Sequence, residues 1–170
     1  MQMRMTDLFL KELDREGVVT RKTLERVPEG KNDWKPHEKS MPLGYLTSMV
    51  ALMPSWVALV INQDELDINP PPEKRNPPKA MNTAKELVAA LDDSIAKAKE
   101  ALKNTTDDHL LTTWRMLSRG KVVLEQPRHV MLRDGVMNHL AHHRGQLTVY
   151  LRLNDQAVPS IYGPSADEPV

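Results

Sequence analysis

The chain contains no cysteine and few aromatic residues, and its charges cancel. Without cysteine among its 170 residues, it has no disulfide framework, thiolate metal site or cysteine nucleophile, which leaves His, Asp and Glu as the reactive side chains. Its 23 basic residues balance 23 acidic ones, and only 4% of the residues are aromatic. Nucleic-acid binding depends on excess positive charge and on base stacking, so we expect no nucleic-acid partner.

Long apolar runs are also scarce. The amino-terminal segment MQMRMTDLFLKELDREG mixes charged residues such as Arg4 and Asp7 with its apolar ones, and we expect no later run to reach the roughly 18 apolar residues of a membrane span. These features predict a soluble protein with no membrane partner, and the lack of cysteine fits the reducing cytoplasm. With 170 residues, 40% of them hydrophobic, we expect one domain over residues 1–170.

Four segments have apolar residues at every third or fourth position, which predicts four helices. Their approximate ranges are 5–27, 43–61, 83–103 and 128–153. Pro28 and Gly30 end the first helix, and Pro54 is expected to kink the second because it removes a backbone donor. Thr83 and Glu86 have the spacing of a capping box, which predicts the start of the third helix.

Two stretches between these helices break the pattern. NPPPEKRNPPK at 69–79 contains five prolines, which predicts a stiff extended crossover. HLLTTWRMLSRGKVVLEQPR at 109–128 has β-branched and apolar residues on both sides of SRGK, which predicts a short hairpin or irregular arm turning at Arg119 and Gly120. Four helices with one long crossover describe an all-α four-helix bundle.

Three of the six histidines lie within NHLAHHRGQ at 138–146. His139 and His143 are one helical turn apart and about 40° apart around the helix, so both imidazoles can converge on one zinc or nickel ion. Gln146 lies one further turn along the same face, where it can orient a ligand or a water. The alternative is a half-buried helix face whose histidines bond to backbone or water, and the spacing alone leaves the two interpretations about even.

Three other polar residues bear on this cluster. Glu16 lies on the apolar stripe of the first helix and needs a partner if buried, which can be an imidazole, an ion or water at the bundle end. His142 flanks the histidine pair and is the nearest candidate base. Arg144 lies about 140° from His139 around the helix, so we expect it to reach a carboxylate or the carboxyl-terminal tail instead. The tryptophans Trp34, Trp56 and Trp114 are interpreted as structural anchors.

Two blocks of the chain carry most of its motif residues. They are ERVPEGKNDWKPHEKSMPLGYL at 25–46 and NHLAHHRGQLTVYLR at 138–152, the second followed by VPSIYGPSADE at 158–168. Together they resemble the DinB/YfiT-like family of metal-dependent four-helix-bundle proteins over nearly the whole chain. The resemblance implies an up-down-down-up bundle, dimers in many members, and one metal bound by three histidines. Most members have no assigned activity, and some are thiol-dependent transferases or isomerases.

The resemblance places the HxxxH pair of the fourth helix on His139 and His143. On the second helix, the pattern LGxLAxHxAxxPxW reads LGYLTSMVALMPSW, so Met49 occupies the position of the third histidine. A thioether is a soft ligand that suits Cu(I) better than zinc or nickel. Three outcomes stay open: Met49 packs as core without an ion, a weaker site uses two histidines with waters and Glu16, or His37 moves in.

We therefore expect a DinB-like protein of unassigned activity with a degenerate divalent-metal site, in which zinc or nickel has reduced or no occupancy. The expected setting is a cytoplasmic homodimer with a small-molecule ligand. The alternative is a metal-dependent transferase or hydrolase that acts on a small molecule, thiol-dependent or not, in which the metal acidifies a bound water or thiol. The sequence leaves open whether the protein is an enzyme.

Overall fold

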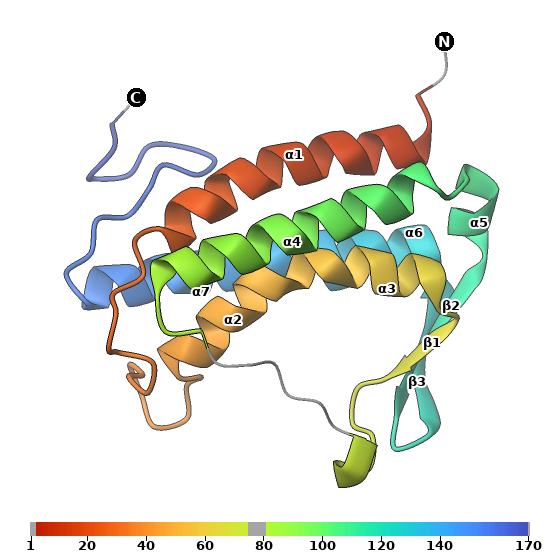
Figure 1. The fold of residues 1–170 in the computed structure, drawn as a ribbon, viewed down its shortest axis with the longest axis horizontal. Helices are drawn as coiled ribbons and strands as arrows, with labels where there is room; N and C mark the ends of the chain where they lie inside the picture. The colour runs from red at the N-terminus through yellow and green to blue at the C-terminus, as the bar shows by residue number, and fades with distance from the viewer. Residues whose placement is uncertain (1–2, 75–80, 170) are drawn as a thin grey trace.

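The computed structural model describes residues 3–74 and 81–169, and most of them are helical (Figure 1). The α-helices are α1 (Met5–Leu24), α2 (Leu43–Leu52), α3 (Trp56–Asn62), α4 (Ala84–Lys103), α5 (Asp107–Leu111), α6 (Arg128–Met131) and α7 (His139–Leu153). A π-helical turn over Leu132–Asn138 joins α6 to α7. The helix-rich part of the prediction is confirmed, although α5, a five-residue helix, was not expected.

Local signals define two of the helix boundaries as predicted. Pro54 lies in a 3₁₀ turn, Met53–Ser55, which separates α2 from α3 and confirms the expected kink. At the start of α4, the Thr83 hydroxyl accepts from the Glu86 backbone N–H at 3.1 Å, while the Glu86 carboxylate accepts from the Thr83 N–H at 3.2 Å. The predicted capping box is therefore present.

The long helical segments run in two opposite directions. In Figure 1, α1 and the α6–α7 segment run from right to left, whereas α2–α3 and α4 run from left to right. Helix α4 packs against α1 on one side and against α2 and α3 on the other, and α2 also contacts α7. Their facing sides bury one continuous apolar core that includes Leu13, Leu46, Leu91 and Leu147. This burial is the main source of helix stability, because isolated helices of this length are marginal in water.

A three-stranded mixed sheet lies at one end of the helices, so the prediction of an all-α fold with a short hairpin or irregular arm holds only in part. Strands β2 (Thr113–Ser118) and β3 (Lys121–Pro127) are antiparallel and turn at Arg119 and Gly120, whose φ angles are 53° and 73°. Two left-handed residues are typical of a tight hairpin turn, and the predicted hairpin is confirmed. The unexpected strand is β1 (Glu65–Asp67), which pairs in parallel with β2. Three residues are too few to show strand periodicity.

The proline-rich crossover is described only in part. Residues 75–80 lie outside the described residues. In the part that is described, Pro72–Lys74 form a 3₁₀ turn, so the prediction of a uniformly extended crossover is wrong there.

One apolar segment is longer than the sequence pattern suggested. Within the described residues, the helical stretch Leu43–Asn62 is long and apolar enough to cross a membrane by length and composition. The protein itself buries 56% of that window, and the core helix of a soluble protein meets the same criterion. A single segment of this kind is weak evidence for a membrane span.

Candidate metal centre and adjoining pocket

His139 and His143 face each other along α7. Their Nε2 atoms are 2.7 Å apart, and their ring centroids are 4.5 Å apart. His143 is buried and His139 is half-buried. Two Nε2 atoms this close can both lie roughly 2 Å from one ion. The structure therefore places the two imidazoles in the converging arrangement that the HxxxH spacing predicts.

Gln146 orients His143 from the next turn of α7. The Gln146 Oε1 atom is 2.7 Å from His143 Nδ1 and, being an amide oxygen, accepts the proton carried there. This leaves the lone pair of His143 Nε2 directed toward His139, as in histidines whose second nitrogen is held by an outer partner. Burial lowers the pKa of His143, and the nearby His139 and His142 lower it further against the opposing effect of Gln146. The neutral imidazole is the form that binds metal ions.

His142 lies beside the pair with its side chain exposed to solvent. Its ring meets the edge of the His143 ring at a centroid distance of 4.9 Å. It does not line the pocket described below. Its role as a base stays a prediction.

The α2–α3 segment covers the histidines from the other side. The Trp56 ring lies 5.8 Å from the His139 ring. Met49 lies in α2, seven residues before Trp56 and on the other side of the 3₁₀ turn. It is half-buried and packs against the apolar core. Its packing is the behaviour expected of a flexible side chain that fills a gap in the core.

Glu16, the possible accessory ligand, is bonded to partners other than the histidines. Its Oε2 atom accepts hydrogen bonds from Arg144 Nη2 at 2.7 Å and from the Tyr162 hydroxyl at 2.6 Å. Burial raises the pKa of Glu16, but these two partners outweigh it and the pKa is lowered. In residues 3–74 and 81–169, no group of three or more His, Asp or Glu side chains is placed to hold a metal ion.

Arg144 is the centre of this second cluster, where it meets both a carboxylate and the tail, as the sequence suggested. It is 1% exposed and also donates to the Thr20 hydroxyl at 2.9 Å. Its Nη2 atom lies 2.5 Å from the Tyr162 hydroxyl, and its guanidinium carbon is 5.2 Å from the centre of the Tyr162 ring. The cluster joins α1, α7 and the carboxyl-terminal tail through one buried cation.

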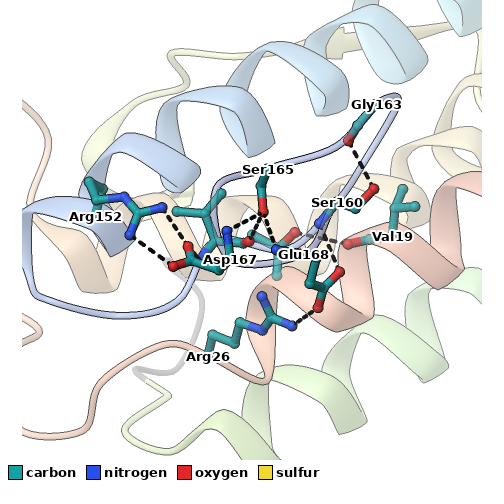
Figure 2. Close-up of polar contacts among 10 residues, drawn as sticks. Val19, Arg26, Arg152, Ser160, Gly163, Ser165, Asp167 and Glu168 are labelled. Atoms are coloured by element: carbon teal, nitrogen blue, oxygen red, sulfur yellow. Dashed lines mark hydrogen bonds and ion pairs between the residues drawn. The ribbon is translucent and has the colours of Figure 1, made fainter. Parts of the chain in front are cut away.

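Acidic residues near its end hold the tail on the helices (Figure 2). Asp167 pairs with Arg152 of α7 at 2.5 Å, and Glu168 pairs with Arg26 just after α1. The Arg152 guanidinium lowers the pKa of Asp167, and the Ser160 backbone N–H together with Arg26 lowers the pKa of Glu168. The tail therefore folds back against its own chain and seats Tyr162 over Arg144.

A pocket of about 570 Å³ adjoins the histidine pair. Its wall is formed by residues of α2, α3, β1, β2, α6, the π-helical turn and α7, namely Tyr45, Trp56, Leu59, Val60, Leu66, Asp67, Ile68, Trp114, Met116, Met131, Gly135 and His139. Trp56 and Trp114, which the sequence suggests are structural anchors, both line this pocket. No local pattern reveals it, because the residues come from segments that only the fold brings together.

Comparisons with known proteins agree on one family. A sequence model of the DinB family matches residues 1–169. The chain is 26% identical over 166 residues to the uncharacterized protein YrdA of Bacillus subtilis (strain 168), which covers 95% of this chain and 90% of that protein.

Two solved structures have the same fold. A DinB-like protein from Bacillus cereus ATCC 10987 superposes with a TM-score of 0.70 at 22% identity, over 91% of this chain and 95% of that chain. The DinB-like protein YjoA of Bacillus subtilis gives a TM-score of 0.67 at 19% identity, over 89% of this chain and 96% of that chain. At these identities the two structures inform the fold alone.

Proposed function

Because the chain belongs to the DinB family, we propose that it holds a degenerate divalent-metal site at His139 and His143 and binds a small molecule in the adjoining pocket. The proposal includes the family's up-down-down-up four-helix bundle as the scaffold, with the mixed sheet added at one end. It also includes a homodimer in the cytoplasm, which light scattering and cell fractionation test directly.

The observation that carries the proposal is the pairing of two imidazoles whose Nε2 atoms are 2.7 Å apart, with Gln146 bonded behind one of them. This donor set fits a borderline divalent cation such as zinc or nickel. A bound cation of this type can acidify a coordinated water or thiol. The two histidines alone supply fewer protein ligands than the three or four usual for zinc.

Met49 explains why the affinity is expected to be low. A thioether is a poor zinc ligand, and Met49 packs with the core instead of offering a third nitrogen. The remaining coordination positions are left to water or to a bound molecule. Occupancy is therefore expected to be partial at low metal concentration.

A metal-dependent transferase or hydrolase is the second candidate function. It is favoured by the position of His139, which belongs both to the histidine pair and to the wall of the pocket. A small molecule in this pocket would lie next to the ion, where an activated water or thiol can reach it. In that case His142 remains the candidate base.

Metal analysis of protein purified without a nickel column tests the main proposal. The unmodified protein is expected to take up zinc weakly and lose it on dialysis, whereas Met49→His is expected to retain about one zinc per chain. His143→Ala is expected to take up none. Zinc uptake that is unchanged in His143→Ala would contradict the proposal.

His142→Ala is the matched control for that experiment, because it removes an exposed imidazole one position away from His143. Its zinc uptake should equal that of the unmodified protein. If instead His142→Ala and His143→Ala lose zinc equally, the ion lies at the helix surface and the proposed site is wrong.

A further inference from the structure

We infer that the pocket beside His139 selects an uncharged, largely apolar small molecule. This inference rests on the proposed function only in assigning a ligand to that pocket. Its volume of about 570 Å³ is in the range of cavities that hold small ligands. Most of its wall is apolar and includes Trp56, Leu59 and Met116. Such a wall favours a ligand that leaves water readily.

In the metal-free protein, the charges around the pocket disfavour an anionic ligand. Asp67 is the one acidic or basic residue, histidine apart, among the described residues of its wall. The described wall offers no lysine or arginine to compensate the cost of removing an anion from water. A phosphate or carboxylate would also lie close to a residue of like charge.

Asp67 does not provide a strong cation site either. Its carboxylate oxygens accept from the backbone N–H groups of Asn69 at 2.9 Å, Arg119 at 3.1 Å and Gly120 at 2.7 Å. These contacts tie the carboxylate to the hairpin turn, which lowers its attraction for a ligand cation. The pocket therefore favours a neutral ligand over either kind of ion.

The absence of a side chain at Gly135 makes room for a neighbouring residue of the pocket wall. Gly135 lies in the π-helical turn before His139, and a Cβ at this position would lie 2.7 Å from Met131 Sδ and closer still to Cε. The missing side chain lets Met131 lie across the pocket wall. Single π-helical turns of this kind occur frequently at functional sites. The wall next to His139 is therefore shaped by a residue that cannot be enlarged without moving Met131.

Two fluorescent probes that differ by one charged group test the inference. N-phenyl-1-naphthylamine is neutral, and 8-anilinonaphthalene-1-sulfonate has the same rings with an added sulfonate. In metal-free protein, the neutral probe is expected to bind about tenfold or more tightly than the sulfonate. Equal binding of the two probes, or tighter binding of the sulfonate, would overturn the inference.

A substitution that fills the pocket shows whether the neutral probe binds there. Leu59→Trp enlarges a half-buried residue of the wall, and Leu153→Trp makes the same change at an exposed position of α7 outside the pocket. The first variant is expected to lose binding of the neutral probe by about tenfold, and the second to retain it. Unchanged binding to a folded Leu59→Trp would contradict the inference.

A charge added at the rim keeps the test decisive if the filled variant does not fold. Ile68 is on the wall yet 57% exposed, and Val149 is 56% exposed on α7 outside the pocket. Ile68→Arg is expected to tighten sulfonate binding severalfold, whereas Val149→Arg leaves it unchanged. An equal effect of the two substitutions would show that the probe binds elsewhere and would overturn the inference.

The proposal of a metal site and the inference about the ligand class can fail separately. The neutral probe is expected to bind His143→Ala as it binds the unmodified protein, even if no zinc is taken up by either. In that outcome the metal proposal fails and the ligand class stands. Zinc uptake without saturable binding of the neutral probe would sink the ligand class alone.

Discussion

Two neighbouring residues of α7, His143 and Arg144, belong to two buried polar clusters of opposite character. The histidine cluster consists of His139, His143 and Gln146, and the arginine cluster consists of Arg144, Glu16, Thr20 and Tyr162. Arg144 is matched by a buried carboxylate and a hydroxyl group of α1 and by a hydroxyl group of the tail. Among the described residues, the two histidines hydrogen-bond only to each other and to one amide.

This difference separates a structural site from the proposed functional one. A buried charge that is paired with an opposite charge holds elements together, because breaking the pair leaves an uncompensated partner. The two histidines form no ion pair of this kind, since they bond to each other and to a neutral amide, and buried ionisable groups with shifted pKa values often lie where proteins bind or react. We therefore expect the arginine cluster to stabilise the fold, whereas the histidine cluster forms the proposed metal site.

The largest effect on stability is expected when the cation of the arginine cluster is removed. Arg144→Met is expected to lower the free energy of unfolding by about 3–5 kcal/mol, because Glu16 is left buried and charged. Urea denaturation measures the loss. Adding Glu16→Gln to this variant should restore part of the stability, and a loss well below 1 kcal/mol in the single variant would contradict the structural role.

A smaller loss is expected when the tail loses its contact with the arginine cluster. Tyr162→Phe removes the hydroxyl that joins Arg144 and Glu16, at an expected cost of about 1 kcal/mol for a residue whose ring is largely exposed. Tyr45→Phe is the control, since that exposed hydroxyl makes no hydrogen bond with any described residue. Thermal unfolding of both variants gives the comparison, and equal effects would show that the tail contact carries no stability.

Acid should weaken the arginine cluster. Although burial raises the pKa of Glu16, its hydrogen bonds from Tyr162 and Arg144 leave it below the ordinary value of 4.5. The unfolded chain then binds more protons, so the stability from Glu16 is present above about pH 4.5 and is lost as pH falls through the lowered pKa. Glu16→Gln should show a shallower decline in unfolding free energy from about pH 6 to about pH 3. Identical slopes would rule out Glu16 as a contributor.

The smallest effect on stability is expected in the histidine cluster. His143→Leu removes a buried imidazole and its bond to Gln146, and we expect the free energy of unfolding to change by less than about 1 kcal/mol because a well-packed apolar side chain replaces a costly polar one. The same urea titration as for Arg144→Met measures it. A loss of several kcal/mol would place the histidines among the structural residues and remove the contrast between the clusters.

Sequence patterns predicted the features whose signals are local. The capping box at Thr83 and Glu86 and the break at Pro54 depend on residues within one or two turns of each other. The hairpin turn at Arg119 and Gly120 is likewise visible in a short segment. The pairing of His139 with His143 follows from helical spacing alone. These predictions succeeded because the interacting groups are close in sequence.

Local sequence patterns did not predict the contacts between distant segments. The strand β1 pairs with β2 about 50 residues later. Glu16 was considered as a metal ligand because its position on an apolar stripe shows that it needs a partner but does not name one. The partner is Arg144, 128 residues away.

The sequence by itself determined the helices, their caps and breaks, the hairpin turn and the family, including the Met49 substitution in the metal motif. Only the tertiary structure decided which buried charges pair and where a pocket forms. Helical periodicity specifies which face of an element is buried, because it arises from one backbone geometry. The identity of the partner across the core depends on how several such faces pack together, and so on the whole chain.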